Sequence, residues 1–128
     1  MILGLKVTGV EVNRTWWLSK YSPPLLLKNV LLIDDSCDSF ADCLPSTSSS
    51  ALMFVYFNSA SAFESYINTF EGDVIIIIGP DHLIKEKNHK YCNPQPFVSI
   101  PNWSLKYSSI FQEDGDAAAI YERNRAIT

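Results

Sequence analysis

The stretch WSLKYSSIFQEDGDAAAIYER, residues 103–123, decides how the end of the chain folds. Residues 103–111 alternate in part between apolar and polar side chains, which is typical of a strand with one covered face. The segment EDGD, residues 113–116, supplies turn residues, and the apolar run AAAIYER, residues 117–123, follows it. The pattern predicts two antiparallel strands joined by a short turn, so that the chain ends in a hairpin.

The chain before this hairpin contains apolar runs that do not alternate. They are LKVTGVEV (5–12), NVLLIDD (29–35), ALMFVYF (51–57) and DVIIIIG (73–79). A run that is apolar at nearly every position predicts a strand covered on both faces, as in a parallel sheet. We therefore expect four parallel strands ahead of the terminal hairpin.

A helix is expected between the third and fourth of these runs. Ser59 or Ser61 can cap its amino end, because a serine hydroxyl accepts a hydrogen bond from a free backbone N–H there. Large apolar residues then recur at helical spacing on one side of the stretch, namely Phe63, Tyr66, Ile67 and Phe70. Strand, helix, strand is the parallel crossover unit. Shorter helical segments are expected at 13–18 and 38–44.

Composition limits the class of protein. The chain has 128 residues, 47% of them hydrophobic and 19% charged, which fits a single globular domain over 1–128. The net charge of −4 gives no support for nucleic-acid binding through phosphates. No run reaches the roughly 18 apolar residues of a membrane span. Three cysteines without a CxxC pair predict thiols in a reducing, cytoplasmic compartment.

Taken in order, these elements resemble the later strands of the class I S-adenosylmethionine-dependent methyltransferases. VTGVEVN and NVLLIDDSCDSF are similar to the family's second and third strands, and ALMFVYFNSA to its fourth. GDVIIIIGP, WSLKYSSIF and GDAAAIYERN are similar to the fifth, sixth and seventh, and the family inserts its seventh strand antiparallel between the fifth and sixth. The resemblance implies an α/β, Rossmann-like, three-layer fold with a mostly parallel sheet and a C-terminal antiparallel hairpin.

The resemblance also implies a cofactor, S-adenosylmethionine, and residues that hold it. Glu11 would accept hydrogen bonds from the two ribose hydroxyls, since one carboxylate offers two oxygens to a vicinal diol. Asp34 or Asp35 would accept one from the adenine amino group. Asn58 and Gly79 would line the side where the methyl group is transferred. No catalytic acid or base stands out, and an asparagine such as Asn58 at a strand end is also common as a turn or cap residue.

The family's first strand and its glycine-rich turn have no counterpart before Leu5, where the only glycine is Gly4. We therefore expect a partial domain, from a truncated gene product or a degenerate paralogue, that is inactive or incomplete as an isolated chain. The second and fourth strands normally flank the first, so each would expose an open edge. Such an edge predicts pairing with another protein or with a second copy of the chain.

Other interpretations compete with this one. A non-catalytic protein-binding module of the same fold would use the open edge and exposed aromatic residues. The paired acids of VLLIDDS also resemble the first strand of receiver domains, but the fourth apolar run lacks an aspartate at the end where a receiver is phosphorylated. His82, His89 and Cys92 are too few and too loosely spaced for a zinc site, so no metal is expected.

Overall fold

The computed structural model describes residues 8–11, 29–32, 50–80, 92–111 and 115–125. The chain divides into two compact units, Met1–Leu44 and Pro45–Thr128. The helical segments expected at 13–18 and 38–44 lie outside the described residues.

The described part of the first unit is a pair of parallel strands. Strand β1 spans Thr8–Glu11 and β2 spans Asn29–Leu32. Thr8 pairs with Asn29 at one end and Glu11 with Leu32 at the other, so the two strands start and end together. Both predicted strands are confirmed, each over a shorter range than its apolar run.

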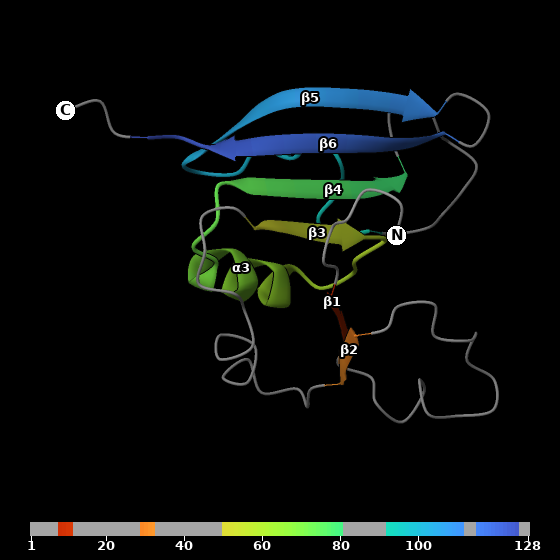
Figure 1. Ribbon diagram of the computed structural model, residues 1–128. Helices are drawn as coiled ribbons and strands as arrows, with labels where there is room; N and C mark the ends of the chain where they lie inside the picture. Colours follow the sequence, from red (N-terminus) through yellow and green to blue (C-terminus); the bar gives the residue numbers. More distant parts are fainter. Residues whose placement is uncertain (1–7, 12–28, 33–49, 81–91, 112–114, 126–128) are drawn as a thin grey trace. The chain divides into compact units, whose positions relative to one another are not determined.

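The second unit contains a four-stranded mixed sheet. Its strands are β3 (Ala51–Val55), β4 (Val74–Pro80), β5 (Trp103–Phe111) and β6 (Asp116–Arg123). They lie side by side in the order β3-β4-β6-β5, which Figure 1 shows from olive through green to blue. β3 and β4 are parallel, whereas β6 runs antiparallel to both of its neighbours. The predicted terminal hairpin is confirmed, and its last strand lies between β4 and β5.

Helix α3, Ala60–Thr69, connects the two parallel strands β3 and β4. Ser59 caps it, as predicted, by accepting a hydrogen bond of 3.3 Å from the backbone N–H of Ala62. The apolar side of α3 packs against β3, because the Phe54 ring lies 4.8 Å from that of Phe63 and 6.4 Å from that of Tyr66. Among the described residues, no helix is long and apolar enough to cross a bilayer.

One face of the four-stranded sheet forms the core of this unit. Ile75 and Ile77 are 0% and 1% exposed, and Ala119, which pairs with Ile77, is fully buried. On the other face, Met53 and Val55 of β3 are 54% and 52% exposed. The strands were expected to be covered on both faces, and in β3 they are not. The described elements form a small α/β unit with an open mixed sheet, and the three-layer, mostly parallel arrangement stays a prediction.

Candidate functional site at the carboxyl ends of the strands

Glu11 is the last residue of β1, at the carboxyl end of a parallel pair. β2 ends at Leu32, the residue paired with Glu11, so the carboxyl ends of the two strands lie side by side. Asp34 and Asp35 themselves lie outside the described residues. The carboxyl ends of parallel strands are where open α/β sheets bind their ligands. The backbone of Glu11 therefore lies at the end of the strand pair where such folds bind their ligands.

Asn58 lies beyond the carboxyl end of β3 and is joined there to a segment distant in sequence. It forms an isolated parallel bridge with Asn93. The Asn93 N–H donates to the Phe57 carbonyl oxygen over 2.8 Å, and the Ser59 N–H donates to the Asn93 carbonyl oxygen over 3.0 Å. The bridge fixes the backbone on both sides of Asn58, while the residue itself is exposed. Asn58 is thus held at the strand end with its side chain open to solvent.

Tyr56, which leaves β3, adopts a left-handed backbone conformation with φ of 50°. Such a conformation is uncommon for a bulky residue and costs on the order of 1–3 kcal/mol, so the surroundings have to hold it in place. The Tyr56 N–H donates to the Ile78 carbonyl oxygen over 2.9 Å and keeps the turn attached to β4. Side chains held in this way gather at functional sites more often than elsewhere. Tyr56, which is 40% exposed, therefore joins Asn58 at the candidate site.

Gly79 lies near the end of β4 and is buried. A Cβ built on Gly79 would lie 3.6 Å from Cδ of Pro96 and 3.7 Å from Sγ of Cys92, which is ordinary van der Waals contact. The segment that carries Asn93 therefore also covers Gly79. The two residues expected to line the side of methyl transfer therefore differ in exposure. Asn58 is open to solvent, whereas Gly79 is buried beneath Cys92 and Pro96.

The side chains at this end of β3 and β4 can orient a ligand but offer little acid or base chemistry. Asn58 and Asn93 present amides, which donate and accept hydrogen bonds without a charge. Within the described ranges, no group of three or more histidine, cysteine, aspartate or glutamate side chains could hold a metal ion. His82 and His89 lie outside those ranges. The arrangement suits binding and positioning of a substrate.

Sequence reasoning missed Asn93 and Tyr56. Asn93 reaches β3 only through the fold, because a long segment separates it from Asn58. The signal that the sequence offered was the proline-rich stretch CNPQPF, residues 92–97, whose prolines exclude a regular helix or central strand. Tyr56 was placed inside a strand because its aromatic ring continues the apolar run.

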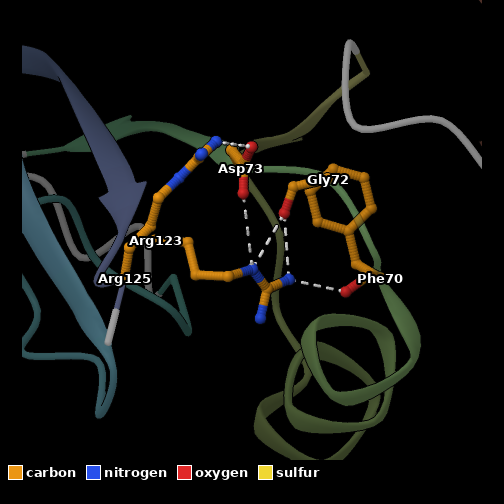
Figure 2. Close-up of polar contacts among 5 residues, drawn as sticks. All are labelled: Phe70, Gly72, Asp73, Arg123 and Arg125. Atoms are coloured by element: carbon orange, nitrogen blue, oxygen red, sulfur yellow. Dashed lines mark hydrogen bonds and ion pairs between the residues drawn. The ribbon is translucent and has the colours of Figure 1, made fainter. Parts of the chain in front are cut away.

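At the opposite end of β4, a cluster of polar contacts joins the end of β6 to the turn after α3. Figure 2 shows the Arg123 guanidinium directed at the backbone of this turn. Its Nη2 donates to the carbonyl oxygens of Phe70 and Gly72 over 2.7 and 2.9 Å, and its Nε donates to Gly72 over 3.1 Å. Asp73 lies 3.9 Å from Nε and forms an ion pair of 2.6 Å with Arg125.

Aromatic packing completes this cluster. The Trp103 ring covers the Arg123 guanidinium, whose Cζ lies 4.5 Å from the ring centroid, and Trp103 also stacks against Phe70. Arg123 therefore donates to carbonyl oxygens of its own chain, and one face of its guanidinium lies against the Trp103 ring. We interpret this cluster as a structural connection between α3, β4 and β6.

Comparison with models of known protein families gives no match, and comparisons with curated proteins and with solved structures give none either.

Proposed function

We propose that the chain is a domain of the class I S-adenosylmethionine-dependent methyltransferase type and that it binds the nucleoside part of that cofactor. The observation that carries the proposal is the strand order β3-β4-β6-β5 with β6 reversed. The family places its fourth, fifth, seventh and sixth strands in the same order, with only the seventh reversed. In the terminal hairpin, the second strand, β6, lies between its hairpin partner β5 and the earlier strand β4. This arrangement is a more specific sign of the family than an alternation of strands and helices alone.

The position of Glu11 supports a cofactor-binding role. It ends a strand whose parallel neighbour ends at the paired residue Leu32, a few residues before Asp34 and Asp35. An acid at the end of one strand suits the two hydroxyls of a ribose, and an acid after the next strand suits the amino group of adenine. When bound, the cofactor would supply the electrophilic methyl group that is bonded to its sulfonium sulfur.

The chain's own contribution to such a reaction would be to position the methyl acceptor. Methyl transfer depends mainly on proximity and alignment, so a site without an acid or a base is compatible with it. Asn58 carries an exposed amide beyond the end of β3 that can hold an acceptor by hydrogen bonds.

Calorimetric titration of the purified chain with S-adenosylhomocysteine tests this proposal. We expect saturable binding that Glu11→Ala weakens by at least about tenfold, because two charge-assisted hydrogen bonds are lost. Glu64→Ala is the matched control, since Glu64 is an exposed acid on α3, in the other compact unit. Absence of heat from a folded chain, or equal affinity of the Glu11→Ala and Glu64→Ala variants, would refute cofactor binding through Glu11.

A non-catalytic protein-binding module of the same fold is the second candidate. Met53 and Val55, exposed at 54% and 52% on one face of β3, favour it, because large apolar side chains on an open sheet face can take part in binding a partner. This candidate predicts a folded chain that gives no heat with S-adenosylhomocysteine.

A further inference from the structure

Strand β5, Trp103–Phe111, is an edge strand. It pairs with β6 on one side, and no described strand pairs with its other side, which Figure 1 shows as the top of the sheet. The backbone N–H and C=O groups along an open edge can pair with another extended strand. This edge therefore has the chemistry of a strand-pairing surface.

The part of β5 from Tyr107 to Phe111 lacks the features that usually protect an edge. Proteins block open edges with charged side chains, prolines or bulges. The segment Tyr107–Phe111 contains no charge and no proline, and three of its side chains are large, apolar or aromatic, and exposed: Tyr107 at 66%, Ile110 at 46% and Phe111 at 47%. A bulge between Leu105 and Tyr107, next to the charged Lys106, marks where this segment begins. Pairing of β5 with another extended strand is therefore favoured over the short segment Tyr107–Phe111, which begins at the bulge.

The side chains of this segment are arranged symmetrically about Ser109. The register with β6 places Tyr107, Ser109 and Phe111 on one face of the sheet, opposite Ile120, Ala118 and Asp116. Ser108 and Ile110 lie on the other face, opposite Ala119 and Ala117. Two aromatic residues of one face therefore stand at equal distances on either side of a small, uncharged residue.

We propose that β5 pairs antiparallel with β5 of a second copy of the chain, about a two-fold axis at Ser109. In this register Tyr107 lies opposite the partner's Phe111, and Ser108 lies opposite the partner's Ile110. Aromatic pairs directly opposite each other stabilise antiparallel strands, and two serines at the axis bring no like charges together. The two four-stranded sheets join into one continuous sheet.

The symmetry of the segment is the reason to assign a second copy as the partner. In a two-fold interface both copies use the same surface, so a residue that contacts a second residue of the partner is matched by the reverse contact. Tyr107 and Phe111 satisfy this condition for each other, because they share a face and are equally far from Ser109. Because both copies use the same edge of β5, this two-fold pairing closes as a dimer. The proposal does not depend on cofactor binding.

Sedimentation equilibrium of the full chain over a range of concentrations tests the dimer, and charge substitutions test its register. Tyr107→Lys or Phe111→Glu alone should raise the dimer dissociation constant by at least about tenfold, because each removes both aromatic pairs. Combining Tyr107→Lys with Phe111→Glu should restore dimerisation to within about threefold, since opposite charges then face each other across the axis. Combining Tyr107→Lys with Phe111→Lys places like charges there and should leave the chain monomeric.

Two controls distinguish an effect at the β5 edge from an effect at another surface and from misfolding. Val55→Lys changes an exposed apolar side chain on β3 and should leave the dissociation constant unchanged. Circular dichroism should be unchanged for every variant, and so should the midpoint of urea unfolding at a concentration low enough for the wild type to be monomeric, because the substituted side chains are exposed. A monomeric wild type, a dimer insensitive to Tyr107→Lys, or loss of the dimer on Val55→Lys would overturn the proposal. Equal behaviour of the two doubly substituted chains would refute the register.

Discussion

At the scale of single residues, Tyr121 shows how the hairpin is tied to the segment before it. The side chain is 2% exposed, and its hydroxyl donates to the Val98 carbonyl oxygen over 2.7 Å. Burial raises the pKa of Tyr121 from 10.0 to about 12, although a backbone hydrogen bond at Phe97 lowers it. The phenol thus stays neutral in the folded chain at a pH where it ionises in the unfolded chain.

This difference predicts a loss of stability in alkali. Below pH 10 both states hold the proton, and as the pH rises from 10 to 12 only the unfolded state loses it, so the free energy of unfolding falls by roughly 2 kcal/mol. Urea unfolding of the wild type and of Tyr121→Phe at several pH values measures this. The variant should lack most of the decrease, and an equal decrease in both would contradict the assignment to Tyr121.

Substitution by alanine should have different effects on the free energy of unfolding at Gly72 and at Gly79. A Cβ at Gly72 would come within 2.6 Å of the Ser50 carbonyl oxygen and would also meet the Phe70 ring, whereas a Cβ at Gly79 makes ordinary contacts. Gly72→Ala should lower the free energy of unfolding by about 1–3 kcal/mol, and Gly79→Ala by less than about 0.5 kcal/mol. Thermal or urea unfolding of the two variants distinguishes them, and equal losses would contradict the packing described at Gly72.

At the scale of secondary structure elements, Arg123 holds the end of β6 to the turn between α3 and β4. Arg123→Lys should lower the free energy of unfolding by about 2 kcal/mol, because an ammonium group cannot reproduce the planar contacts to two carbonyl oxygens and the Trp103 ring. Arg125→Ala is the control. Its side chain is 78% exposed, so the loss should stay below about 1 kcal/mol. Urea unfolding measures both, and equal losses would show that Arg123 is no more than a surface ion pair.

Local patterns predicted the elements of the second unit well. The strand expected at 103–111 has those bounds, and the strand expected at 117–123 begins one residue earlier, at Asp116. β3 ends at Val55 although its apolar run continues through Tyr56 and Phe57, because Tyr56 turns into the left-handed region. The apolar side chains of such a run do not reveal a backbone turn. Nor do they reveal that Met53 and Val55 would be exposed, since exposure depends on what packs against the sheet.

The candidate site could be predicted only where a strand end marks it. Glu11 and Asn58 were named as candidates because each stands at the end of an apolar run, and their roles stay predictions. Asn93 was not found, because its bridge to Asn58 is a long-range contact that no periodicity encodes. The cover over Gly79 was missed for the same reason, since Cys92 and Pro96 reach it only in the folded chain.

At the scale of the whole molecule, the order of the strands depends on pairings between distant segments. Periodicity predicts that strands exist but does not determine which of them are neighbours, so the insertion of β6 between β4 and β5 was anticipated only through the family resemblance. The same order leaves β5 at the edge of the sheet. One feature of the topology thus supports both the methyltransferase-like fold and the dimer, and the two proposals are tested independently.

We propose that Glu11 and the acids after β2 bind the nucleoside of S-adenosylmethionine. Two-dimensional NMR of the ¹⁵N-labelled chain, titrated with S-adenosylhomocysteine, tests both whether and where it binds. We predict saturable changes in the amide resonances of Glu11, Asp34 and Asp35, with those of Tyr107 to Phe111 unchanged. An unchanged spectrum of the folded chain, or changes confined to β5 and β6, would contradict nucleoside binding at Glu11.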